Sequence, residues 1–169
     1  MLAFVLAALA ASTSSPALEI SVPWWERVTV TVDDKGKQQS CQYEVSLTPA
    51  GATPCDEELA ASLPSSRGPT GRFSKMTFER RFSPGRRPDS GQLPAGDELL
   101  GRKVLFLTFD ADGSISSCDV VAATGDMAFR YDCEQARREQ FQLLASTTSG
   151  GAHQAFMTVL AYGHSEHIA

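Results

Sequence analysis

The chain has 169 residues, of which 42% are apolar and 21% charged, and its formal net charge is −5 at pH 7. This composition is typical of one folded domain or two small ones and excludes wholesale disorder. The charge is uneven: residues 18–88 hold ten basic and nine acidic side chains, and residues 89–169 hold five basic and eleven acidic ones. An acidic half beside a near-neutral half does not suit a phosphate backbone, so nucleic acid is not an expected partner.

The N-terminal segment, residues 1–17, predicts a signal peptide. An apolar run at residues 2–11 is followed by small residues up to Ala17, although no Lys or Arg precedes the run. The run is shorter than the roughly 20 residues that a membrane-spanning helix needs. A buried N-terminal helix and an uncleaved anchor are the alternatives. We expect export to the periplasm or the exterior, with no stable membrane span after signal removal.

The remainder contains an internal repeat. The alternating strand and Asp-containing turn at residues 28–36 recur, without a gap, at residues 105–113. Alternation of apolar and polar residues predicts half-buried strands, and the Asp-to-Gly segments predict hairpin turns. Cysteines occupy equivalent places in both copies: Cys41, Cys55, Cys118 and Cys133.

The cysteines form two local pairs of almost equal spacing, which predicts disulfides Cys41–Cys55 and Cys118–Cys133. Four cysteines allow three pairings, and the recurrence within each copy favours this one. Each bond closes a loop whose constraint is worth about 3 kcal/mol of unfolding free energy. Zinc would need thiolates two to four residues apart, and free thiols are the other alternative.

Each copy is interpreted as strand, strand, helix and strand, so the expected fold class is α+β, with two tandem β-β-α-β units at residues 18–83 and 99–169. A Pro- and Gly-rich linker is expected at residues 84–98. Return strands are expected near 38–46 and 114–123, helices at about 56–63 and 128–145, and closing strands at 72–82 and 153–162. In the closing strands, residues 78–82 align with residues 156–160.

The second copy resembles the C-terminal domain of TonB-type energy transducers. The resemblance is carried by residues 105–115 and 118–126: an alternating strand, an Asp-x-Gly turn, a polar return strand and a Thr-Gly step before the helix. It spans residues 102–162, and the cysteine pair is similar to that of some exported members. Such a transducer would also carry a membrane helix and a long charged spacer, and neither pattern is present here. The resemblance therefore implies a fold and a mode of binding, the addition of a partner's strand to a sheet edge.

No catalytic constellation is apparent, so the chain is not expected to be an enzyme or to hold a cofactor or metal. The serines lack a G-x-S-x-G context, and thiols engaged in disulfides cannot act as nucleophiles. Asp110, Asp112 and Gly113 favour a turn over a calcium loop, because Val121 stands where such a loop needs Glu.

Four residues are candidate partner-binding positions: Trp24, Trp25, Arg80 and Arg81. Adjacent indoles on a strand point to opposite faces, so one can be core and the other a binding anchor. The two arginines either protect a solvated strand edge or form a patch for the acidic second unit or for an anionic envelope surface.

The function expected from these features is that of a non-enzymatic, periplasmic protein-interaction module. It would bind an envelope protein or peptide by strand addition or in a groove between the units. The alternatives are a secreted inhibitor or structural scaffold, and an enzyme of unrecognised chemistry.

Overall fold

A computed structural model describes residues 18–35, 37–47, 51–55, 73–89, 91–125, 129–142 and 153–165. The predicted signal peptide at residues 1–17 and the helix expected at residues 56–63 lie outside the described residues.

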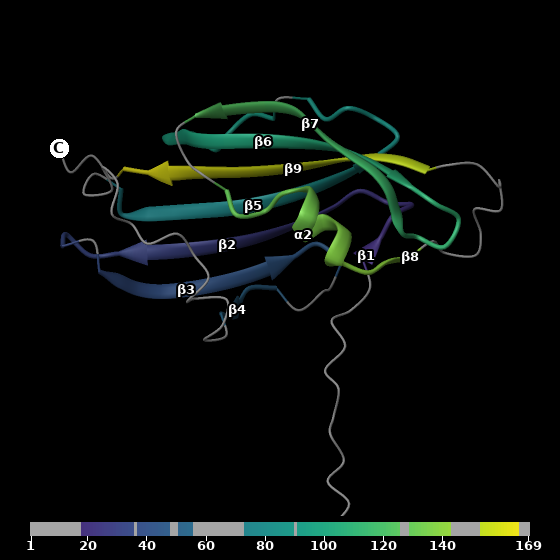
Figure 1. Ribbon diagram of the computed structural model, residues 1–169. Helices are drawn as coiled ribbons and strands as arrows, with labels where there is room; N and C mark the ends of the chain where they lie inside the picture. Colours follow the sequence, from purple (N-terminus) through teal and green to yellow (C-terminus); the bar gives the residue numbers. More distant parts are fainter. Residues whose placement is uncertain are drawn as a thin grey trace, which may run out of the picture.

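A seven-stranded antiparallel sheet forms the body of the described chain (Figure 1). Its spatial order is β4-β3-β2-β5-β9-β6-β7, and a second, two-stranded parallel sheet pairs β1 with β8. The elements are β1 (Leu18–Glu19), β2 (Trp24–Val32), β3 (Gln38–Val45), β4 (Thr53–Pro54), β5 (Lys75–Pro84), β6 (Asp97–Phe109), β7 (Ile115–Gly125), α2 (Cys133–Arg138), β8 (Phe141–Gln142) and β9 (His153–His164).

The predicted α+β class with two tandem β-β-α-β units is wrong. The described chain is mostly strand, with one short helix, and both halves contribute to a single sheet. The physical reason lies at its centre, where the closing strands β5 and β9 pair antiparallel from Lys75↔His164 to Pro84↔Ala155. Through this pairing, the backbone groups along one edge of each closing strand hydrogen-bond to the closing strand of the other half of the chain.

The two hairpins keep the same register over residues 28–32 and 105–109. Val30 faces Cys41 in the first hairpin, and Leu107, the equivalent of Val30 in the second copy, faces Cys118. Both hairpins also carry an irregularity at equivalent places, after Thr31 and after Thr108. The repeat seen in the sequence is therefore a repeat of structure.

The closing strands correspond one position later than predicted. Val28 pairs with Phe78, and Leu105, the equivalent of Val28, pairs with Met157. Phe78 thus matches Met157 in its place on the sheet, whereas the sequence alignment had matched it to Phe156.

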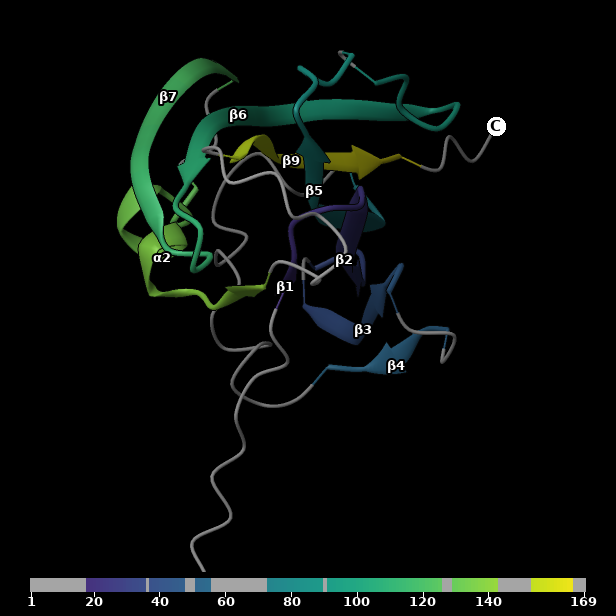
Figure 2. The same ribbon diagram turned by 90° about the vertical axis from the view of Figure 1, so that its right-hand side faces the viewer.

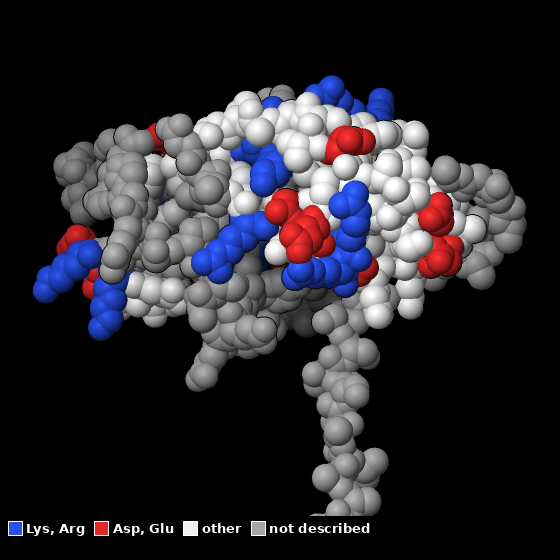
Figure 3. Space-filling view, viewed as in Figure 1, with Lys and Arg blue, Asp and Glu red and all other residues white. Residues whose placement is uncertain are grey.

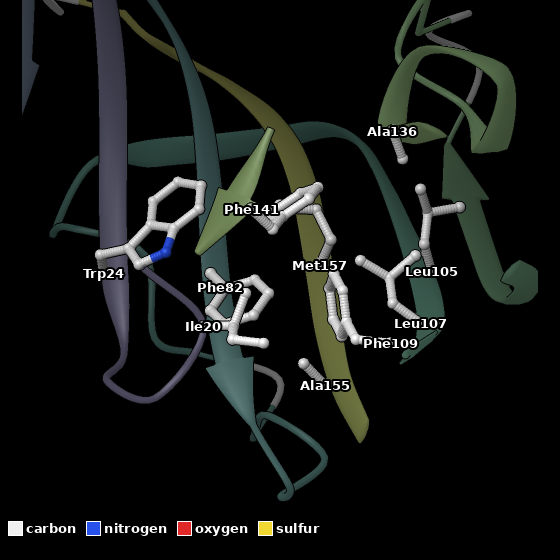
Figure 4. Close-up of a cluster of buried hydrophobic side chains, with 10 residues drawn as sticks. All are labelled: Ile20, Trp24, Phe82, Leu105, Leu107, Phe109, Ala136, Phe141, Ala155 and Met157. Carbon is white, nitrogen blue, oxygen red and sulfur yellow. The ribbon is translucent and has the colours of Figure 1, made fainter. Parts of the chain in front are cut away.

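The core lies between the sheet and the elements that cover one of its faces, here called the helix face. Both views show α2, β1 and β8 against this side of the sheet (Figures 1 and 2). Trp24 stacks on Phe82 with ring centroids 5.3 Å apart, and Phe141 of β8 packs between Phe82 and Phe109. The buried cluster in Figure 4 comprises Ile20, Trp24, Phe82, Leu105, Leu107, Phe109, Ala136, Phe141, Ala155 and Met157.

The helix expected at about residues 128–145 is much shorter, since α2 covers Cys133–Arg138 and β8 follows. The carboxylate of Asp132 caps it by accepting from the backbone N–H groups of Glu134 and Gln135 at 2.8 and 3.1 Å. At its other end Glu139 is extended, with φ −79° and ψ 152°. Burial of Phe141 in the core and the contacts of Glu139 described below stop the helix, because packing outweighs helix propensity.

Both predicted disulfides are confirmed. Cys41–Cys55 joins β3 to the residue after β4, and Cys118–Cys133 joins β7 to the first residue of α2. The second bond therefore fixes the helix to an outer strand of the sheet.

Candidate functional site

Strand β7 forms one edge of the seven-stranded sheet and is the upper strand in Figure 1. Within the described part of the chain it pairs with β6 alone, so its outer row of backbone groups has no strand partner there. The strand is 11 residues long and contains no Lys, Arg or Pro. Val120 and Val121 are 52% and 41% exposed. A long edge with exposed β-branched side chains and without lysine or proline guards is a template for pairing with another strand.

The opposite edge of the sheet differs. There β4, only two residues long and ending in Pro54, pairs with Gln42 and Tyr43 of β3. The Cys55 N–H donates to the Cys41 carbonyl at 3.1 Å, and the disulfide between these two residues holds this segment in place. Proline cannot donate to a further strand, so this edge is partly closed.

Three features fix the position of β7. A register shift between Val104 and Leu105 leaves Val121 out of the regular pairing with β6. The disulfide to Cys133 ties the middle of the strand to α2. At its end Gly125 has a φ of +84°, and a Cβ there would stand 2.5 Å from the Leu100 carbonyl oxygen. The edge is therefore held on a rigid scaffold, which limits the ordering cost of binding a partner.

The two adjacent tryptophans lie on opposite faces. Trp24 is 2% exposed in the core, and its indole N–H donates to the Glu19 carbonyl at 2.8 Å. Trp25 is half-buried on the back face, the side of the sheet opposite α2, where the Arg27 guanidinium lies 4.4 Å from its ring centroid. The structure thus places Trp24 in a packing role and leaves part of Trp25 accessible.

Arg80 and Arg81 lie on β5, the central strand of the sheet, and so guard no edge. The Arg80 guanidinium pairs with Glu26 at 2.6 Å and with Glu139 from just beyond α2, and it lies 4.8 Å from the Tyr131 ring centroid. Burial lowers the pKa of Arg80, but the two carboxylates outweigh burial and raise it. Burial also raises the pKa of Tyr131, whose hydroxyl donates to Glu139 at 2.8 Å. Arg80 therefore fastens the helix to the sheet.

Arg81 belongs to a charged row on the back face. Its Nε donates to the Glu79 carboxylate, whose side chain is 2% exposed. The Arg27 Nε lies 3.5 Å from the same carboxylate, and the Tyr162 hydroxyl donates to it at 2.9 Å. Burial, with the bond to Glu79, raises the pKa of Tyr162 to about 12. Two arginines and one hydroxyl thus compensate a buried carboxylate at the centre of this face.

Two hollows flank this row. One of about 310 Å³ includes Arg81, Arg102 and Thr158, and the other of about 340 Å³ includes Arg27, Tyr162 and His164. The His164 ring lies 2.7 Å from the Asp97 carboxylate. Sequence reasoning did not select Glu79, Tyr162, Arg102 or Thr158. Alternation along each strand indicates which residues share a face of that strand. It does not indicate which distant strands pair, so it could not bring these four residues together.

Near α2, the described residues of the helix face form no charge patch of a single sign. Figure 3 shows basic and acidic side chains next to one another over the middle of this face. Across the described ranges, no three His, Cys, Asp or Glu side chains gather as a metal site. Asp110 and Gly113 form a turn in which the Gly113 N–H donates to the Asp110 carbonyl at 3.0 Å.

Comparison with protein-family models, curated proteins and solved structures finds no match to this chain. No helix among the described residues is long and apolar enough to cross a membrane.

Proposed function

We propose that this chain is a non-enzymatic protein-interaction module that binds an extended peptide segment of a partner by strand addition to β7. The observation that carries the proposal is the 11-residue β7 edge, paired on one side within the described chain and lacking Lys, Arg and Pro. Backbone hydrogen bonds would supply affinity, and alternate side chains would supply specificity. The resemblance of the second copy to TonB-type C-terminal domains supports the same mode of binding.

The two disulfides indicate an oxidising environment, extracellular or periplasmic. We place the module in the periplasm, where disulfides persist and envelope proteins present extended segments. Exposed Val120 and Val121 predict a partner strand with apolar side chains at facing positions.

The test begins with peptides selected from a displayed random library against the folded, disulfide-bonded chain. Binding is then measured for Asp119→Pro and Val120→Pro. These residues lie in a regular stretch of pairing, so their N–H groups point alternately toward β6 and outward. Proline at one of these positions removes an N–H that points toward β6, and proline at the other removes an N–H that points outward. The second variant is expected to keep the fold, measured by circular dichroism, and to lose at least about tenfold in peptide affinity.

The matched control applies the same pair of substitutions to the opposite edge, Glu44→Pro and Val45→Pro on β3, which also lie in a regular stretch of pairing. The folded member of that pair is expected to bind the peptide as the native chain does. Full affinity in the folded β7 variant, or an equal loss in the folded β3 variant, would contradict strand addition to β7. Failure of the selection to return any binding peptide would also count against the proposal.

A further inference from the structure

The hollow around Arg81 on the back face has the chemistry of an anion site. It measures about 310 Å³ and brings together three guanidinium groups, of Arg81, Arg87 and Arg102, with one carboxylate, of Asp89. The arginines come from β5, from the segment that follows it and from β6. The remaining lining residues are Pro88, Val104, Ala122, Thr158 and Leu160. Three positive groups therefore face two negative ones, Asp89 in the lining and the buried Glu79 carboxylate that contacts Arg81, which leaves a formal excess of +1.

An uncompensated hydroxyl group lies in the same hollow. Thr158 on β9 is 6% exposed, and its Oγ1 is buried without a hydrogen-bond partner among the described atoms. Buried hydroxyl groups are almost always hydrogen-bonded, because an unmade bond costs free energy. Thr158 sits opposite Arg81 in the β5–β9 register, so this hydroxyl and the Arg81 guanidinium share one face of adjacent strands. An acceptor bound there would satisfy the Thr158 hydroxyl and would lie next to the Arg81 guanidinium.

Arg81 is held in position for such a role. Its Nε is engaged by the buried Glu79 carboxylate. Gly91 also packs against this guanidinium, so closely that a Cβ there would stand 2.5 Å from Arg81 Nη1. A guanidinium held by such contacts binds an oxyanion with little further loss of side-chain entropy.

We infer that this hollow binds the phosphate group of a small organic phosphate monoester, with the apolar wall of Val104, Ala122 and Leu160 receiving the organic part. Guanidinium groups bind phosphate oxygens in a bidentate fork, and a phosphate monoester offers three terminal oxygens to these donors, whereas a carboxylate offers two. The phosphate group is shared by soluble esters and by phospholipid headgroups. The donor groups of this site lie on β5, β6, β9 and the segment after β5, and Ala122 is the residue of β7 in its wall.

The experiment titrates the full, disulfide-bonded chain with phenyl phosphate by calorimetry and by amide chemical shifts, beside inorganic phosphate and benzoate. We expect phenyl phosphate to bind and to shift the Arg81, Thr158 and Arg102 amides, with benzoate at least about tenfold weaker. Thr158→Val keeps the side-chain shape and removes the hydroxyl, and it is expected to weaken phenyl phosphate at least about tenfold without loss of the fold. Arg87→Met is expected to weaken it similarly.

The matched control is Arg138→Met, which removes an exposed arginine of α2 on the opposite side of the sheet and should leave the affinity unchanged. Vesicles containing phosphatidic acid distinguish the source: binding that Arg87→Met abolishes assigns the site to a lipid phosphate, and absence of vesicle binding assigns it to a soluble ester. Absence of phenyl phosphate binding, equal affinity for benzoate, or unchanged affinity in both Thr158→Val and Arg87→Met would overturn the inference.

Discussion

Replacing Arg80 by Met tests how α2 is held on the sheet. The Arg80 side chain is 13% exposed, and it neutralises Glu26 and Glu139, which are 23% and 25% exposed. Methionine fills a similar volume but leaves both carboxylates unpaired. Removing one partner of a buried ion pair costs about 3–5 kcal/mol, and partial exposure of the carboxylates puts this case at the lower end, about 3 kcal/mol.

Urea denaturation followed by tryptophan fluorescence measures this loss. With a slope of about 2 kcal/mol per molar, a loss of about 3 kcal/mol lowers the midpoint by about 1.5 M. Arg138→Met is the matched control, since its pair with Glu134 is 69% and 70% exposed and should contribute less than about 0.5 kcal/mol. Combining Arg80→Met with Glu139→Gln should cost clearly less than the sum of the single changes, because each breaks the same contact. Strict additivity, or an Arg80→Met midpoint equal to the control, would refute the role assigned to Arg80.

Three further predictions concern the disulfide, a turn and the tyrosines. Replacing Cys118 and Cys133 together by Ala should lower the free energy of unfolding by about 3 kcal/mol in urea titrations, and a loss below about 1 kcal/mol would contradict the constraint assigned to this bond. Gly113→Ala should cost about 1–3 kcal/mol in the same assay, because Gly113 has a φ of +85° and a Cβ there would clash with the Phe141 carbonyl oxygen; an unchanged midpoint would show that the turn relaxes freely. Burial raises the pKa of every tyrosine, to about 12 for two of them, so folding favours the neutral phenols. The contribution of the tyrosines to stability should be constant below pH 10, and stability should fall as the pH rises from 10 toward 12. Phenolate absorbance rising near pH 10 in the still-folded protein would contradict this for Tyr43, Tyr131 and Tyr162.

Local features of the fold could be predicted from the sequence. Alternation along residues 28–32 and 105–109 and the matching Asp-containing turns predicted both hairpins, and the paired cysteines predicted both disulfides. These features depend on neighbours within one copy. The pairing of β5 with β9 joins residues of different copies, and no local sequence pattern indicates that the two closing strands pair with each other. For that reason the prediction of two tandem β-β-α-β units was wrong.

In the candidate sites, too, local features could be predicted and contacts between distant segments could not. Sequence alternation put Trp24 and Trp25 on opposite faces, but it could not tell that Trp24 stacks on Phe82 while Arg27 covers Trp25. Glu139 fell inside the helix predicted at about residues 128–145. In the folded chain it turns out of the helix to meet Arg80, which belongs to the first copy.

Backbone amide hydrogen exchange, with and without a selected peptide, is the most direct test of strand addition to β7. Strand addition predicts that alternate amides of β7 gain protection when the peptide binds, while those of β3 at the opposite edge do not change. Protection confined to α2, to β3 or to the back-face hollows would show that the peptide binds elsewhere and would contradict the claim.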